Sequence, residues 1–132
     1  PCNHGNRNTT FKDVYFKNNI AGTNGGAIDW YAHEGLVYNS NFTNNNALNG
    51  GAIYVDSTSG HINITKSDFN SNNAVENGGA INLVASSVVV NNSRFTLNTA
   101  SNGGALYVGG EGKTNYIYGQ SYELIFYICN KW

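Results

Sequence analysis

The chain has little charge, no methionine and only two cysteines among its 132 residues. Charged residues make up 11% and the formal net charge is -1, so the sequence lacks the basic stripe that a nucleic-acid-binding protein needs. No apolar run is long enough to cross a membrane as a helix, and no signal peptide is recognisable. Because the sequence begins with proline and lacks methionine, we expect a processed or excised segment of a longer chain.

The two cysteines, Cys2 and Cys129, stand near opposite ends of the chain. If repeating coils stack at about 4.8 Å each, their Cα atoms lie roughly 20 Å apart. A disulfide requires Cα atoms within about 7 Å. We therefore expect no disulfide between them, and cysteine usage does not identify the cellular compartment.

The chain does contain a double motif that occurs four times. Each copy begins with Phe-x-x-Asn-x-Ala and continues, a few residues later, with Asn-Gly-Gly-Ala and an aliphatic residue. The phenylalanines are separated by 26, 27 and 26 residues, a period typical of stacked repeats in which each unit contacts its neighbours. We expect the extra residues of the longer second step in the turn-forming run at 56–60. The phenylalanines are Phe16, Phe42, Phe69 and Phe95, and the asparagines are Asn19, Asn45, Asn72 and Asn98.

Alignment of the four copies predicts a strand directly after each glycine pair. The positions one and three residues after the motif alanine are apolar in every copy and are predicted to point inward. The position between them is predicted to point outward, and its residues are Asp29, Tyr54, Asn82 and Tyr107. Each unit has two further short apolar stretches, one of them around the phenylalanine, so we expect three strands per coil.

These features predict an all-β fold, a parallel β-helix with about four full coils and a degenerate fifth. The phenylalanines are expected to stack inside the coils, the asparagines to form a side-chain ladder, and the glycines to provide bends. Leucine is too sparse for a leucine-rich repeat, and the aspartate ladder of a calcium-binding β-roll is missing. We predict a partial coil or cap over residues 1–10, four coils over 11–108, and a degenerate fifth coil or cap over 109–132.

The paired motifs resemble the FxxN and GGA[ILV] repeats of the chlamydial polymorphic outer-membrane protein family. They are also similar to tandem coils in adhesin-like surface proteins of methanogenic archaea. The resemblance extends from Phe11 to Val108 and includes all four copies of both motifs. It implies a right-handed parallel β-helix at the cell surface or outside the cell, with further coils in the same longer chain. It implies adhesion or a spacer role rather than catalysis.

The best candidate binding surface is the outward column, together with Tyr31. Tyrosine offers a rigid apolar face and a polar tip, which suit a sugar ring or a surface-protein ligand. In the alternative interpretation, these side chains only cover the face of a sheet. The candidate residues are Asp29, Tyr31, Tyr54, Asn82 and Tyr107.

An enzymatic alternative rests on Asp29 and Asp56, since parallel β-helices also carry polysaccharide hydrolases and lyases. The repeat register separates these two residues by one coil and two positions, roughly 8 Å. An inverting glycosidase pair requires about 6.5–9.5 Å. No third carboxylate and no cationic column accompany them, so we treat catalysis as the alternative and expect no cofactor.

A metal site is not expected either. His33, Glu34 and His61 fall at comparable positions in adjacent coils, and Glu34 is predicted to lie beside His61. A metal site would need more ligands and groups that orient them. We therefore interpret these side chains as a solvated pair.

Overall fold

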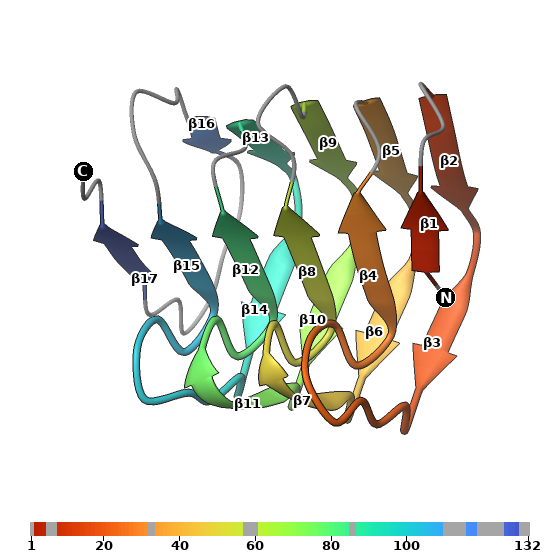
Figure 1. Ribbon diagram of the computed structural model, residues 1–132. Coiled ribbons are helices and arrows are strands. Elements are labelled where there is room, and N and C mark those ends of the chain that lie inside the picture. The colour runs from red at the N-terminus through yellow and green to blue at the C-terminus, as the bar shows by residue number, and fades with distance from the viewer. Residues whose placement is uncertain are drawn as a thin grey trace.

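The computed structural model is an all-β solenoid of about four turns, whose strands run side by side along one axis (Figure 1). No helix occurs in the part of the chain that it describes. The strand pairs are parallel. The structure describes residues 2–4, 8–31, 34–56, 61–84, 87–109, 116–118 and 126–129.

Three sheets run the length of the stack, which confirms the three strands predicted for each coil. Sheet A contains, in spatial order, β1 (Cys2–His4), β4 (Ile28–Tyr31), β8 (Ile53–Asp56), β12 (Ile81–Val84), β15 (Leu106–Gly109) and β17 (Phe126–Cys129). Sheet B contains β2 (Asn8–Lys12), β5 (Glu34–Tyr38), β9 (His61–Thr65), β13 (Ser87–Asn91) and β16 (Tyr116–Tyr118). Sheet C contains β3 (Tyr15–Lys17), β6 (Asn41–Thr43), β10 (Asp68–Asn70) and β14 (Arg94–Thr96).

A fourth, short sheet was not predicted. Sheet D pairs β7 (Asn46–Asn49) with β11 (Asn73–Asn77) between the phenylalanine strands and the glycine corners. Isolated bridges extend this pairing to the first and fourth copies of the motif. The register of β7 and β11 shifts between Ala74 and Asn77, so the third copy holds one extra residue in a bulge. This bulge follows Phe69 and lies outside the longer step from Phe42 to Phe69. Asp56 pairs with Val84 and His61 pairs with Ser87, so the second coil has four residues between these strands where the third has two, and the extra residues of that step fall at 57–60, within the predicted run.

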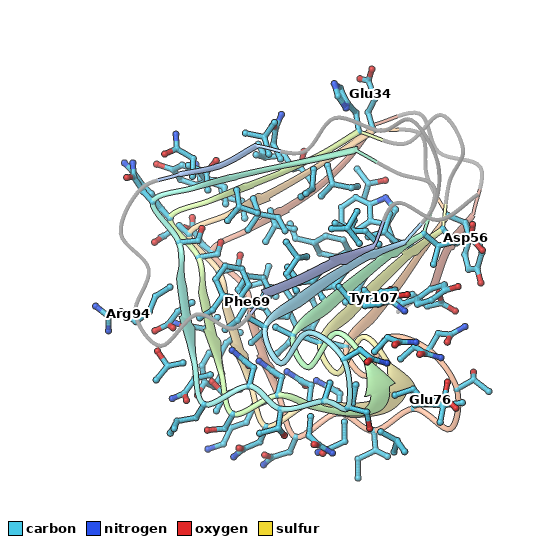
Figure 2. The ribbon with its side chains drawn as sticks, turned by 90° about the vertical axis from the view of Figure 1, so that its left-hand side faces the viewer. Glu34, Asp56, Phe69, Glu76, Arg94 and Tyr107 are labelled. Atoms are coloured by element: carbon cyan, nitrogen blue, oxygen red, sulfur yellow. The ribbon has the colours of Figure 1, made fainter. Side chains whose placement is uncertain are left out.

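The phenylalanines stack on one another inside the solenoid, as predicted. Ring centroids are 4.9 Å apart for Phe16 and Phe42, 4.6 Å for Phe42 and Phe69, and 4.8 Å for Phe69 and Phe95. Figure 2, which looks along the stack, shows Phe69 in the interior enclosed by the sheets. This spacing equals the separation of hydrogen-bonded strands, so each coil places its ring directly on that of the next.

The asparagine ladder is also confirmed. Asn45 Nδ2 donates to Asn72 Oδ1 at 2.9 Å, and Asn72 Nδ2 donates to Asn98 Oδ1 at 3.0 Å. The same oxygens accept backbone N–H groups, and the Nδ2 atom of Asn72 also donates to the carbonyl oxygen of Phe42. Asn45 and Asn72 are fully buried, so the ladder satisfies polar groups that water cannot reach.

The corners have tight backbone geometry. The first glycine of each motif has a positive φ, for example 60° at Gly25. The second is held by close approach, because a Cβ on Gly51 would overlap the carbonyl oxygen of Gly79 in the next coil. Another corner, just before each ladder asparagine, has a positive φ on residues other than glycine, including 56° at Leu97. That strained position was not predicted from the repeat.

Strands at both ends of the described chain continue the stack. β1 and β2 pair with β4 and β5, and β16 and β17 pair with β13 and β15. Cys2 and Cys129 lie in the two edge strands of sheet A, about five strand spacings of 4.8 Å apart, which agrees with the expected absence of a disulfide. The boundaries predicted at residues 10 and 108 and the right-handed winding stay predictions.

Candidate functional site

The outward face of sheet A brings four of the candidate residues into one column. Strand pairing aligns Asp29 with Tyr54, Tyr54 with Asn82, and Asn82 with Tyr107. The residues on either side of this column are buried, because side chains alternate between the two faces of a strand. Tyr107 projects from this face in Figure 2, on the side opposite the core.

A second outward column runs beside the first, two residues further along each strand. It contains Asp56, Val84 and Gly109, which are aligned by the pairing of β8, β12 and β15. Tyr31 occupies the corresponding outward position in β4, two residues after Asp29. A Cβ on Gly109 would lie 3.1 Å from the ring of Tyr107, so Gly109 leaves room for that ring. The face therefore combines phenol rings, carboxylates and one amide.

Tyr54, on this face, has a shifted pKa. Its pKa is raised from 10.0 to about 12, first because burial disfavours the phenolate and next because Asp56 repels it. Tyr31 and Asp29 add smaller contributions in the same direction. The hydroxyl of Tyr54 also bonds with the side chain of Asp56. Tyr54 is therefore a neutral hydrogen-bond donor at physiological pH, surrounded by acceptors.

Asn82 departs from the predicted exposed column. Its side chain is only 3% exposed, whereas its neighbours Tyr54 and Tyr107 are partly exposed. These two neighbours lie about 4.8 Å away on either side, and large rings at that distance cover a smaller amide. The Oδ1 atom of Asn82 has no hydrogen-bond partner among the described residues. Residues that share one outward column therefore differ in how exposed their side chains are.

The two carboxylates of the enzymatic alternative lie in the predicted register. Asp29 aligns with Tyr54, and Asp56 follows two residues later on the same strand as Tyr54. The diagonal separation is about 8 Å. Tyr54 interacts electrostatically with both. Within the described ranges, no group of three or more His, Cys, Asp and Glu side chains is placed to hold a metal ion.

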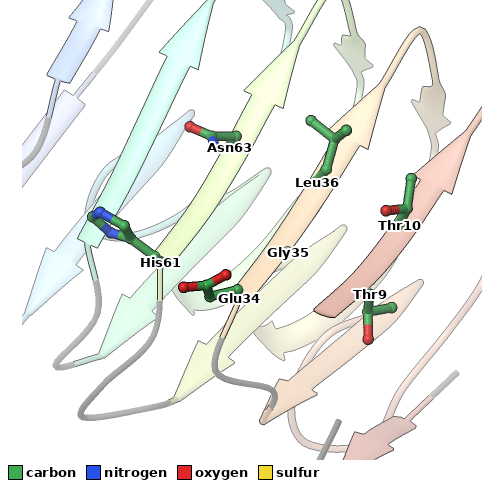
Figure 3. Close-up of a pocket in the computed structure, with 7 residues that line it drawn as sticks. All are labelled: Thr9, Thr10, Glu34, Gly35, Leu36, His61 and Asn63. Carbon is green, nitrogen blue, oxygen red and sulfur yellow. The ribbon is translucent and has the colours of Figure 1, made fainter. Parts of the chain in front are cut away.

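Sheet B carries a pocket of about 380 Å³ on its outer face (Figure 3). Strand pairing places Glu34 directly opposite His61, so their predicted proximity is confirmed. Figure 3 shows both side chains along one edge of the pocket, with Leu36 and Asn63 on the next outward positions. Threonines of β2 complete the lining. His33, grouped with this pair in the sequence, lies outside the described residues.

The sequence did not predict a pair of lysine side chains that meet at the corner between sheets B and C. The ammonium groups of Lys12 and Lys66 lie 5.8 Å and 5.6 Å from the ring centroid of Tyr38. Lys66 also donates to the hydroxyl of Tyr38 at 3.4 Å. These residues come from three successive coils, and only alignment of the strands before each serine would have placed them together. The arrangement is a cation–π cluster on the surface.

Comparison with known protein families finds a similar repeat. Three segments, residues 13–29, 39–56 and 92–109, match the Chlamydia polymorphic membrane protein repeat. Each segment contains one phenylalanine motif and the glycine pair that follows it. The copy around Phe69 falls outside these segments, yet its phenylalanine strand pairs in register with both neighbours. No curated protein and no solved structure matches the chain.

The described residues include no helix long and apolar enough to cross a membrane.

Proposed function

We propose that this chain is an adhesin-like segment of a surface protein, because three of its segments match the Chlamydia polymorphic membrane protein repeat. We further propose that it binds carbohydrate through the outward face of sheet A. The repeat family supports a location at the outer membrane or cell surface. Stacked coils form a stiff rod whose sheet faces are continuous along its length. Such a rod presents the same kind of surface over many coils, which suits contact with an extended ligand.

The observation that carries the proposal is the position of Tyr54 between Asp29 and Asp56. A partly exposed phenol ring provides an apolar surface for the C–H face of a sugar ring. Carboxylates beside it accept hydrogen bonds from sugar hydroxyls, and a carboxylate oxygen accepts from more than one donor. The Tyr54 hydroxyl stays protonated because its pKa is about 12, and its single O–H is engaged with Asp56, so toward a sugar hydroxyl its oxygen acts as an acceptor. The negative local charge favours neutral or basic sugars over acidic ones.

Glycan binding by the purified chain tests this proposal. We expect a glycan array to show binding that is weakened by Tyr54→Ala and by Asp29→Asn. Tyr15→Ala is the matched control, because Tyr15 is 58% exposed and lies on sheet C. A blank array together with capture of a surface protein would replace the glycan with a protein ligand. Absence of both would favour a pure spacer.

The enzymatic alternative rests on the same two carboxylates and is tested separately. If Asp29 and Asp56 form a general acid and general base, the chain releases reducing ends from a polysaccharide, and Asp29→Asn abolishes the release. Binding without release, in wild type and variant alike, favours the adhesin. Release that depends on Asp29 would overturn it.

A further inference from the structure

A second asparagine ladder lies at the corner before sheet A. It is built from the asparagine that precedes each glycine pair, and its members are Asn24, Asn49, Asn77 and Asn102. Asn77 Nδ2 donates to Asn49 Oδ1 at 3.0 Å, and Asn102 Nδ2 donates to Asn77 Oδ1 at 2.9 Å. Asn49 Nδ2 donates to Asn24 Oδ1 at 3.4 Å. Asn102 is the last member of this ladder among the described residues.

Each member of this ladder is followed by glycine, the sequence most prone to asparagine deamidation. In that reaction the glycine amide nitrogen loses its proton and attacks the Cγ atom of the asparagine. A new N–Cγ bond forms, the Cγ–Nδ2 bond breaks and ammonia leaves. Water then opens the resulting succinimide and gives aspartate or isoaspartate. The reaction therefore requires a glycine nitrogen and an asparagine amide that are both able to move.

Three of the four glycine nitrogens are already engaged in the stack. Their N–H groups donate to the carbonyl oxygen of the ladder asparagine in the next coil, at 2.8 to 2.9 Å. The pairs are Gly25 with Asn49, Gly50 with Asn77, and Gly78 with Asn102. No atom of the described residues accepts the N–H of Gly103. Within the described ranges, the hydrogen bond that holds the other three glycine nitrogens therefore has no counterpart at the fourth site.

The side-chain amides of the ladder also distinguish the fourth site from the inner ones. Asn49 and Asn77 each donate to one ladder neighbour and accept from the other, so both ends of the amide are fixed. Asn102 only donates, and its Oδ1 accepts nothing from the described residues. Asn102 is also exposed, whereas the other three asparagines are partly buried.

We propose that Asn102 is the site at which the folded chain deamidates, with water as the only co-reactant, while the same Asn-Gly sequence is protected elsewhere. The product adds a negative charge at the corner before β15 and removes the donor to Asn77. Isoaspartate also lengthens the backbone by one methylene. Since a Cβ on Gly79 would overlap the carbonyl oxygen of Gly104, the coils have no spare room at this corner. Deamidation therefore loosens the fourth coil from the third.

Peptide mapping by mass spectrometry tests the proposal with three internal controls. Cleavage after lysine, arginine and glutamate places the four Asn-Gly pairs in the separate peptides 18–34, 35–66, 77–94 and 95–111. After incubation of the folded chain at mildly alkaline pH, we expect the replacement of NH₂ by OH to be several-fold faster at Asn102 than at Asn49 or Asn77. In concentrated urea, the four sites should react at similar rates.

Two outcomes would overturn the inference. One is that Asn49 or Asn77 deamidates in the folded chain as fast as Asn102. The other is that Asn102 reacts as slowly as they do, which would mean that the corner backbone protects all four sites equally. Asn102→Ser removes the reactive amide and should abolish the mass gain in peptide 95–111. A mass gain that persists in this variant would assign the reaction to Asn98 instead.

Discussion

The indole of Trp30 fills the space in which any side chain at Gly35 would lie. A Cβ built on Gly35 overlaps the indole ring, and Trp30 is fully buried. In the next coil, the corresponding positions are Val55 and Ile62, which are both buried. The core therefore keeps its total volume by exchanging a medium pair for a large and a small residue.

This exchange predicts a strong coupling between the two positions. Trp30→Val leaves a cavity and should lower the free energy of unfolding by about 3 kcal/mol. Gly35→Ile overpacks the core and should cost roughly 3 kcal/mol as well. The double variant reproduces the pair found in the next coil, so we expect it to recover about 2 kcal/mol relative to the sum of the single costs. Urea unfolding of the four proteins measures this difference, and additive costs would contradict the exchange.

The asparagine ladder predicts an unusually costly polar substitution at Asn72. Its amide donates to Phe42 and Asn98 and accepts two hydrogen bonds from Asn45, all in a fully buried position. Asn72→Ala leaves these partner groups without a hydrogen bond, and each unsatisfied buried group costs about 1–3 kcal/mol. We expect a loss of about 3 kcal/mol or more in urea unfolding.

Asn46→Ala is the matched control for Asn72→Ala. The side-chain amide of Asn46, a half-buried residue, donates to the carbonyl oxygen of Asn44 in a solvent-exposed hydrogen bond. Its removal should change the free energy of unfolding by less than about 0.5 kcal/mol. Equal losses at the two positions would mean that the ladder contributes nothing beyond ordinary surface polarity.

Much of this architecture was predictable because the repeat fixes the register. A slip by one residue would turn every inward side chain outward, so aligned copies of Phe42 and Asn45 determine which strands pair and which residues face the core. The column from Asp29 to Tyr107 follows from the same alignment. Periodic sequence thus carries information about contacts between coils that a single strand does not.

The rest depends on contacts that the alignment does not express. The burial of Asn82 results from the size of its two column neighbours, not from its own alternation. In the cluster around Tyr38, Lys12 occupies the aligned position, but Lys66 lies one residue beyond it and reaches the ring diagonally. The positive φ of Leu97 is imposed by the corner, whatever residue stands there.

That corner predicts a stabilising substitution at Leu97. Its φ is 56° and its side chain is 62% exposed, so it combines a strained backbone with little burial. The same corner holds Asn18, Asn44 and Ser71 in the other copies, and asparagine tolerates this conformation better than leucine. We expect Leu97→Asn to raise the free energy of unfolding by about 1 kcal/mol in bacterially expressed protein.

The control for Leu97→Asn is Ile20→Asn. Ile20 is 80% exposed but its φ is not positive, so replacement removes surface hydrophobicity without relieving strain. Its effect on thermal unfolding should be close to zero. A similar gain in both variants would attribute the stabilisation to surface polarity rather than to the backbone.

The raised pKa of Tyr54 predicts a loss of stability at high pH. The folded protein holds this proton up to about pH 12, whereas the unfolded chain releases it near the ordinary tyrosine pKa of 10.0. Below pH 10 both states are protonated, so the contribution is fully present there. Between pH 10 and 12 the unfolded state ionises first, and the free energy of unfolding falls as pH rises. Urea unfolding across this window measures the slope.

Two variants separate Tyr54 from the other tyrosines of the chain. Tyr54→Phe removes the ionisable group and should flatten the part of the slope that belongs to it. Asp56→Asn removes a neighbouring negative charge and a hydrogen-bond partner that both raise the pKa, so the phenol should ionise at lower pH, as followed by phenolate absorbance. If Asp56→Asn left the titration unchanged, burial and the other neighbours, Tyr31 and Asp29, would hold the proton, and Asp56 would not interact with Tyr54 on the outward face of sheet A.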